Sequence, residues 1–125
     1  VSRGLGDVYK RQKEVRDMVF QLGSALLDAC VLAVLDSQDA YGYVLTQSVK
    51  QVMDISESTL YPVLRRLQKD GLLSTYDQPF SGRLRRYYAL TDAGRDKLNE
   101  YRAEWKAYTL RVNSLLYGGN NNDAL

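Results

Sequence analysis

The chain has 125 residues, of which 45% are hydrophobic and 26% are charged, and its formal net charge is only +2. It contains no histidine, which excludes Ser–His and Cys–His catalytic pairs and any histidine-containing metal site. The single cysteine, Cys30, cannot form an intramolecular disulfide, so the composition favours a reducing compartment. No other acid–base cluster is visible, and we expect neither an enzyme nor a metal or cofactor.

The N-terminal part divides into an irregular arm and a long helix. Residues 1–12 have no helical or strand period, and we expect a non-native or disordered arm there. Residues 13–36 predict a helix whose second half is apolar on every face, as in a buried helix. Its longest apolar run, Ala25 to Leu35, has eleven residues broken only by Asp28. A membrane-spanning helix needs roughly 20 residues, and no signal-peptide pattern is present, so we expect a cytoplasmic protein.

A polar break, Asp36 to Ala40, separates this helix from a second one at about Tyr41 to Met53. Asp39 is the expected N-cap of the second helix, because its carboxylate can accept a hydrogen bond from a free N–H of the first turn. The residues expected on its buried face recur at helical spacing and are Leu45, Val49 and Val52.

A third helix is predicted from Ser56 or Ser58 to a stop at Gly71. The choice of N-cap stays open, because only a cap at Ser58 would bring Pro62 near the first turn, where proline costs less. The expected buried face consists of Leu60, Leu64 and Leu67. The opposite face carries hydroxyls and positive charge, which are suited to contacting phosphates.

Two β-rich runs follow, Leu72 to Tyr76 and Arg85 to Leu90. The sequence DQPFSGR between them is polar and has the proline and glycine of a loop tip. We therefore expect a two-stranded hairpin that projects three arginines, Arg83, Arg85 and Arg86.

Thr91 is the expected N-cap of a last helix that ends at Tyr117, before a disordered tail at 118–125. An apolar stripe with alternating spacings of three and four runs along this helix. Its members are Leu98, Tyr101, Trp105, Tyr108, Val112 and Leu115. Pairing with a second copy would cover the stripe and give a homodimer. The stripe could instead fold back on the first helix, and both arrangements can hold at once.

Charge is segregated along the chain. Residues 56–90 hold six basic side chains against three acidic ones, whereas residues 13–55 hold three against six. A basic helix beside a basic hairpin is the arrangement with which a winged helix-turn-helix holds duplex DNA. We thus expect a mainly α (α+β) fold, with a winged helix-turn-helix at 13–90 and a dimerisation helix at 91–117. The candidate DNA contacts are Ser58, Thr59, Tyr61, Arg65, Lys69, Arg83, Arg85 and Arg86.

Some of these candidates have a second interpretation. Arg65 and Lys69 lie late in the helix, where positive charge also complements the helix dipole. Tyr61 could serve packing alone. The three wing arginines could be a solvated hairpin surface, although their density near a loop tip favours DNA.

Three segments, YGYVLTQSV, STLYPVLRRLQKDGLL and GRLRRYYALTDAGRDKL, resemble the PadR family of transcriptional regulators over about residues 24–117. The single C-terminal helix is similar to the short subfamily. The resemblance implies a homodimeric repressor that binds an inverted-repeat operator and releases it when an effector or a modification intervenes.

The resemblance also implies a place for an effector. Some short members bind planar aromatic drugs in a pore at the dimer interface, stacked on a tryptophan of the last helix. Trp105 occupies the matching position, with Leu98 and Tyr101 as further candidate effector contacts. Tyr101 departs from the drug-binding pattern, which has a small residue there, so the sequence leaves the pore open to question. The alternative function is a protein in which aromatic ligand sensing dominates and DNA binding is secondary.

Overall fold

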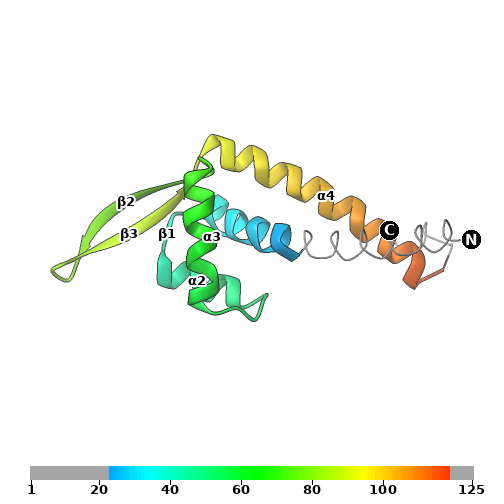
Figure 1. Cartoon of the computed structure of the whole chain (residues 1–125), viewed down its shortest axis with the longest axis horizontal. Coiled ribbons are helices and arrows are strands. Elements are labelled where there is room, and N and C mark those ends of the chain that lie inside the picture. Colours follow the sequence, from blue (N-terminus) through cyan, green and yellow to red (C-terminus); the bar gives the residue numbers. More distant parts are fainter. Residues whose placement is uncertain (1–22, 119–125) are drawn as a thin grey trace, which may run out of the picture.

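The computed structural model describes residues 23–118, and the wing and the last helix point in opposite directions from a group of packed helices (Figure 1). Within this part, residues 23–37 form the first helix. The elements that follow are β1 (Ala40–Tyr41), α2 (Gly42–Lys50), α3 (Glu57–Lys69), β2 (Leu73–Phe80), β3 (Arg83–Leu90) and α4 (Asp92–Leu116). The expected arm at 1–12, the start of the 13–36 helix and residues 119–125 of the expected tail lie outside the described residues.

The second helix is shorter than predicted. It runs from Gly42 to Lys50, and its N-cap is Tyr41, which makes no side-chain capping bond. The prediction of Asp39 as N-cap is wrong, because its carboxylate accepts a hydrogen bond from the hydroxyl of Tyr76 at 2.7 Å instead. Val52 is 74% exposed, since it lies beyond the C-cap, whereas the other two predicted core residues, Leu45 and Val49, are buried.

The third helix is capped by Ser56, whose hydroxyl accepts a hydrogen bond from the backbone N–H of Thr59 at 3.3 Å. This excludes Ser58 as the cap and leaves Pro62 inside the helix, where it has no N–H to donate to the preceding turn. The residues that anchor α3 in the core, Leu60, Leu64 and Leu67, are fully buried as predicted. The helix stop at Gly71 is also confirmed, with φ at +78°.

The wing is longer than the sequence indicated. Strands β2 and β3 pair from Leu73↔Leu90 out to Phe80↔Arg83, so most of the predicted DQPFSGR loop is strand. Only Ser81 and Gly82 form the turn, with φ of 51° and 78°. Positive φ at both central positions is typical of the two-residue turn that matches strand twist. A third, very short strand, β1, pairs with the other edge of β3 in the order β1-β3-β2.

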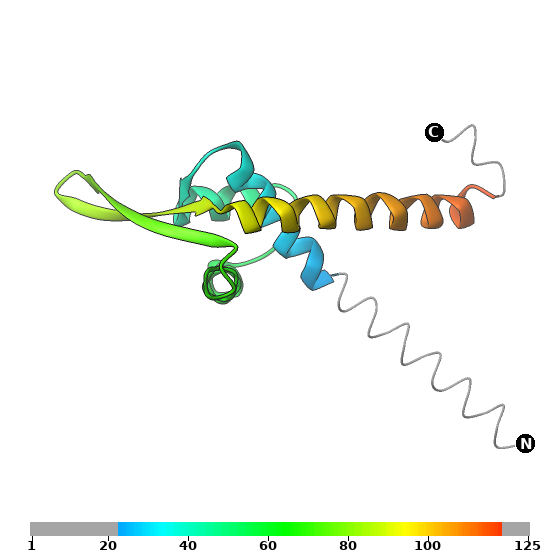
Figure 2. The same cartoon turned by 90° about the horizontal axis from the view of Figure 1, so that it is seen from above.

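The last helix begins where it was predicted. The Thr91 hydroxyl accepts a hydrogen bond from the N–H of Gly94 at 3.0 Å and donates one to the carbonyl of Gly71 at 2.7 Å. Two carboxylate–guanidinium contacts fix this end of α4 to the first helix, because Asp36 accepts from Arg95 at 3.2 Å and from Arg102 at 3.3 Å. The rest of α4 extends away from the body, as Figure 2 shows.

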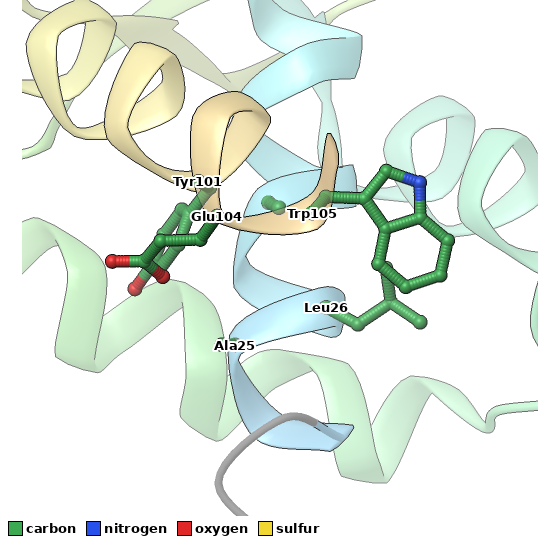
Figure 3. Close-up of a pocket in the computed structure, with 6 residues that line it drawn as sticks. Ala25, Leu26, Tyr101, Glu104 and Trp105 are labelled. Atoms are coloured by element: carbon green, nitrogen blue, oxygen red, sulfur yellow. The ribbon is translucent and has the colours of Figure 1, made fainter. Parts of the chain in front are cut away.

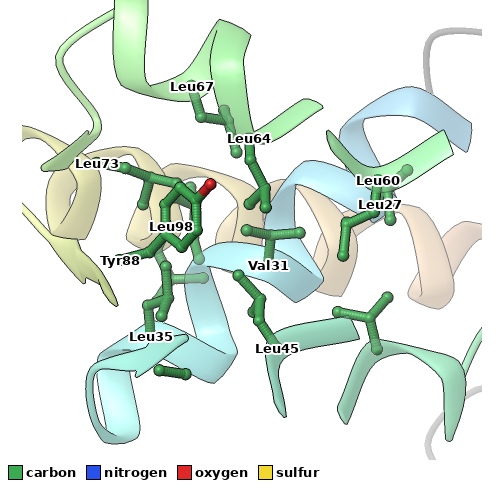
Figure 4. Packing of buried hydrophobic residues seen from close by; sticks show 13 residues of the cluster. Leu27, Val31, Leu35, Leu45, Leu60, Leu64, Leu67, Leu73, Tyr88 and Leu98 are labelled. Carbon is green, nitrogen blue, oxygen red and sulfur yellow. The ribbon is translucent and has the colours of Figure 1, made fainter. Parts of the chain in front are cut away.

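The core lies between the first helix, α2, α3, the base of the wing and the start of α4 (Figure 4). Burying these apolar side chains is the main favourable term for folding, at about 25 cal/mol per Å² removed from water. The buried apolar residues are Leu27, Val31, Leu32, Leu35, Ala40, Leu45, Val49, Leu60, Leu64, Leu67, Leu73, Tyr88 and Leu98. Since α3 contributes three of them and the wing two, the core sets the position of both basic elements.

Candidate nucleic-acid interface

The outward face of α3 carries every residue that the sequence assigned to DNA on this helix. The three leucines hold the opposite face in the core, so this face is directed to solvent. The hydroxyls of Ser56, Ser58 and Thr59 gather at its start, with oxygens 2.9 and 3.1 Å from that of Ser56. The predicted contact residues on this helix are all exposed and are Ser58, Thr59, Tyr61, Arg65 and Lys69.

Two neighbouring arginines of α3 have different surroundings. The Arg66 guanidinium donates a hydrogen bond at 2.6 Å to Asp28, whose side chain is only 6% exposed in the first helix. This hydrogen bond raises the pKa of Arg66. The Arg65 guanidinium forms no hydrogen bond or ion pair with any other residue from 23 to 118. Arg65 is therefore the arginine of α3 that is available to a ligand.

The three wing arginines also differ. Arg86 has a long ion pair of 3.8 Å with Asp77 on the facing strand. Arg85 lies between two rings, with its Cζ 3.4 Å from the ring centre of Phe80 and 4.2 Å from that of Tyr41. Arg83, beside the turn, is exposed, and within the described part of the chain it has no carboxylate partner. The wing thus presents one free, one stacked and one loosely paired guanidinium.

A shallow groove of about 240 Å³ lies between the start of α2, α3 and the outer edge of β3. Figure 1 shows α3 beside the base of the wing, and the amide of Gln68 donates to the hydroxyl of Thr75 across that junction at 3.4 Å. None of the described residues that line the groove has a carboxylate. Its lining residues are Tyr41, Gly42, Tyr43, Tyr61, Arg85, Arg86 and Tyr88.

The predicted stripe of α4 is divided between the core and the surface. Leu98 is 1% exposed and belongs to the core, which removes it as a contact for a partner or an effector. Trp105 is 44% exposed, and its ring centre lies 6.1 Å from that of Tyr108. Leu115, near the end of the helix, is 85% exposed. Tyr108 and Val112 are half-buried.

A small hollow of about 30 Å³ lies where α4 meets the first helix (Figure 3). Tyr101 and Trp105 approach it from α4, and Ala25 and Leu26 approach it from the first helix. Tyr101 is half-buried, and this burial, followed by the charge of Asp28, raises the pKa of its hydroxyl. The residues that line the hollow are Ala25, Leu26, Ala29, Tyr101, Glu104 and Trp105.

Sequence reasoning missed two positioning residues. Asp28 was seen only as an interruption of an apolar run, and a charged residue at such a position is the signal for a buried ion pair. Tyr41, which stacks on Arg85, was assigned to the start of a helix rather than to a strand. Cys30 is half-buried, and burial raises the pKa of its thiol, which disfavours the reactive thiolate.

Comparison with known proteins gives the family. The model of the transcriptional regulator PadR-like family matches residues 31–100. The Transcriptional regulator Rv3488 of Mycobacterium tuberculosis is 43% identical over 65 residues, which are 51% of this chain and 61% of that protein. None of the helices within residues 23–118 is both long and apolar enough to cross a membrane.

Solved structures agree in fold. The crystal structure of smu.1704 from Streptococcus mutans matches with a TM-score of 0.73 and 41% identity, covering 77% of this chain and 91% of the other. A PadR-like transcriptional regulator of Bacillus cereus matches with a TM-score of 0.71 and 33% identity, covering 78% and 98%. The winged helix-turn-helix with a long C-terminal helix is thereby confirmed. The chain belongs to the PadR-like family of transcriptional regulators, and it is not an enzyme.

Proposed function

We propose that this regulator is a homodimeric repressor that binds an inverted-repeat operator in double-stranded DNA. In this proposal α3 enters the major groove, where Arg65 reads a base edge and the hydroxyls of Ser58 and Thr59 contact the start of the site. Lys69 and the wing arginines hold phosphates. The observation that supports the proposal most is the exposed polar face of α3, on which the Arg65 guanidinium has no carboxylate partner among residues 23–118, beside a wing whose ion pair with a carboxylate is the long one of Arg86 with Asp77.

The dimer is inferred from the uneven burial of α4. The helix has 25 residues and is about 37 Å long, but its buried residues, Gly94 and Leu98, lie in the first turns. The stripe at Tyr101, Trp105, Tyr108, Val112 and Leu115 continues beyond them. A second copy on a two-fold axis would cover this stripe and present two α3 helices together. Such dimers read half-sites about 34 Å apart, which is one turn of the duplex.

An effector would release the operator by changing that spacing. The hollow beside Trp105 has room for about one water molecule, so a planar aromatic compound would need walls from both subunits. If the effector favours one spacing of the recognition helices and DNA favours a different one, each must weaken the binding of the other by the same factor.

The test is selection of duplexes from a random pool by the purified chain. The proposal predicts enrichment of an inverted repeat with half-sites about one helical turn apart. A regulator of this kind acts on the chromosome, so the proposal also assigns it to the cytoplasm. Enrichment of a single unsymmetrical site would contradict the dimeric arrangement, and no enrichment at all would contradict the proposed function.

The second candidate function is aromatic ligand sensing, which the 44% exposure of Trp105 favours. Trp105 is the only tryptophan of the chain, so its fluorescence reports directly on this site. We expect a planar aromatic cation to quench it and to weaken binding to the selected duplex, and we expect Trp105→Ala to bind DNA without this response. Quenching without any selected duplex would favour the second candidate. A Trp105→Ala protein that keeps its response would move the effector site elsewhere.

A further inference from the structure

The outer part of the wing has no support from a third strand. Strand β1 ends at Tyr41, which pairs with Tyr87, whereas β2 and β3 remain paired as far as Phe80 and Arg83, four residue pairs further out. Over these four pairs the wing is a two-stranded hairpin that extends away from the packed helices (Figure 1). A two-stranded hairpin is only marginally stable by itself, so the direction of the wing depends on the contacts at its base.

Two neighbouring residues of β2 connect the base of the wing to different parts of the body. The hydroxyl of Thr75 accepts a hydrogen bond from the amide of Gln68 in α3 at 3.4 Å. The hydroxyl of Tyr76 donates one to the carboxylate of Asp39, in the segment before β1, at 2.7 Å. Because successive side chains of a strand point to opposite faces of the sheet, the two bonds hold the wing from both faces. The bond from Tyr76 is the stronger one, since it is shorter and its acceptor is charged.

The ring of Tyr76 belongs to an aromatic cluster on the face of the wing directed away from α3. It stacks on Tyr87 with centroids 5.4 Å apart and an interplanar angle of 7°, and Tyr87 meets the ring of Tyr41 edge-on at 5.7 Å. The guanidinium of Arg85 continues the cluster outward, with its Cζ 4.2 Å from the ring centre of Tyr41 and 3.4 Å from that of Phe80. Because Phe80 is the last paired residue of β2, the cluster connects the base of the wing with its outer end.

We propose that Tyr76 and Asp39 are positioning residues for DNA binding, which set the direction of the wing relative to α3. The leucines of α3 fix this helix in the core, so the two elements meet one duplex together only if the wing also keeps one direction. Arg83 lies four residue pairs beyond Tyr76, a distance of about 13 Å at roughly 3.3 Å per residue. A small rotation at the base therefore displaces the tip considerably. This inference rests on the proposed function and assigns a role within it to two residues outside the candidate DNA contacts.

The first variant removes the hydrogen bond and keeps the aromatic stack. Tyr76→Phe loses only the hydroxyl that bonds to Asp39, so the wing should sample other directions. The apparent dissociation constant then rises by the inverse of the fraction of molecules whose wing has the binding direction. We expect binding to the selected duplex to weaken about threefold to tenfold, the range that corresponds to loss of one hydrogen bond. The matched control is Tyr87→Phe, which removes a hydroxyl from the other ring of the stack and should bind as wild type does.

Two replacements of Asp39 separate position from charge. Asp39→Ala removes the acceptor and should weaken binding as much as Tyr76→Phe does, although loss of a carboxylate would by itself strengthen binding to phosphates. Asp39→Asn keeps an oxygen that can accept the hydrogen bond, and it should bind at least as tightly as wild type. Asp39→Ala combined with Tyr76→Phe should bind no more weakly than either single variant, because both remove the same bond.

A double-mutant cycle with Arg83 shows whether the effect passes through the wing. In an Arg83→Ala background the contact at the tip is already lost, so Tyr76→Phe should weaken binding less than about twofold. NMR relaxation without DNA gives an independent measurement. It should show more motion at the backbone amides of Gln78 and Leu84 in Tyr76→Phe than in wild type, and equal motion at Leu64 of α3.

The outcomes are distinguishable from those of the proposed function. If the chain selects a duplex but Tyr76→Phe binds it like wild type, or Asp39→Ala binds it more tightly, the repressor proposal stands and the positioning role is wrong. An equal loss from Tyr76→Phe with and without Arg83 would likewise show that the hydroxyl does not act through the wing. If the chain selects no duplex, the proposed function fails, and the relaxation measurement alone decides whether Tyr76 and Asp39 hold the wing.

Discussion

Asp28 of the first helix and Arg66 of α3 are joined by a 2.6 Å hydrogen bond across 38 residues of sequence. The Asp28 side chain is 6% exposed and that of Arg66 is 45% exposed, so the carboxylate is nearly buried while the guanidinium reaches solvent. Every buried side-chain N or O atom of the described residues has a hydrogen-bond partner. The pair therefore orients α3 about its own axis, with Arg66 turned inward and Arg65 outward.

Replacing Arg66 by methionine should destabilise the fold, because the nearly buried carboxyl of Asp28 would lose its hydrogen-bond donor. Breaking a fully buried pair costs about 3–5 kcal/mol, and the exposure of Arg66 reduces this to about 1–2 kcal/mol. Urea unfolding measures the difference. The matched control is Arg65→Met, the neighbouring residue without a partner, which should change the free energy of unfolding by less than about 0.5 kcal/mol. If Arg66→Met and Arg65→Met lost the same free energy of unfolding, the ion pair of Asp28 with Arg66 would not have the role assigned to it.

The stability of the link between the first helix and α4 should depend on pH through Asp36. Hydrogen bonds from Arg95 and then Arg102 lower the pKa of this carboxyl below its ordinary 3.8. Because the folded pKa is the lower one, Asp36 contributes stability above pH 3.8 that is lost as pH falls through the folded value. The Asp36→Asn variant should therefore be less stable than wild type at pH 7.

The difference in the free energy of unfolding between Asp36→Asn and wild type should shrink as the pH falls below the ordinary pKa of an aspartate, 3.8. It should also shrink in 1 M salt, because both arginines are about half-exposed and their attraction for Asp36 is screened. Chemical unfolding of both proteins at pH 7 and at pH 3, each at low salt and in 1 M salt, measures how this difference changes. A difference that is independent of pH and salt would show that Asp36 acts through packing alone.

Gly94 should not tolerate even alanine. A Cβ at this position would overlap the carbonyl oxygen of Leu72 and would lie 2.6 Å from the Cδ1 atom of Leu90. Although alanine is the better helix former, Gly94→Ala should cost about 1–3 kcal/mol, because backbone has to move to remove the overlap. Thermal melting measures the loss. Asn99→Ala, at an exposed site of the same helix, should melt close to wild type; a Gly94→Ala protein as stable as wild type would show that α4 can shift at no cost.

Val112→Asp should dissociate the proposed dimer, because it would bury a charge in the apolar stripe of α4. Sedimentation should give a monomer, and binding to the selected duplex should be lost. Asn99→Asp adds the same charge at an exposed position of α4 and should remain dimeric. If the Val112→Asp protein sediments as a dimer, the stripe is not the interface.

The helical parts were predictable from sequence because their signals are local. The leucines of α3 repeat at helical spacing, and Thr91 is a hydroxyl residue at the expected start of the last helix, whereas the cap of α3 stayed open between Ser56 and Ser58. The position of Leu98 could not be predicted in the same way. It belongs to the same stripe as Trp105, and only the docking of α4 on the core decides which members of the stripe are buried.

The strands of the wing are longer than the sequence indicated, and the reason is physical. The outer half of the wing is exposed on both faces, so its strands need no alternation of apolar and polar residues. Alternation is the pattern that indicates a strand in a sequence, so the outer half gives no such indication. Pro79 indicated a loop, but β2 is an edge strand, where proline is tolerated. The two-residue strand β1 has no period at all, and the ion pair of Asp28 with Arg66 depends on packing of distant segments.

In the proposed complex α3 and the wing contact DNA in different ways, and a salt series with two variants tests this most directly. Dissociation constants are measured on the selected duplex and on a random duplex for wild type, Arg65→Ala and Arg83→Ala. Arg65→Ala should cost about 1–3 kcal/mol on the selected duplex and much less on the random one. Arg83→Ala should weaken both alike and flatten the slope of log K against log salt by about 1. Wild-type affinities and slopes for both variants would contradict the account.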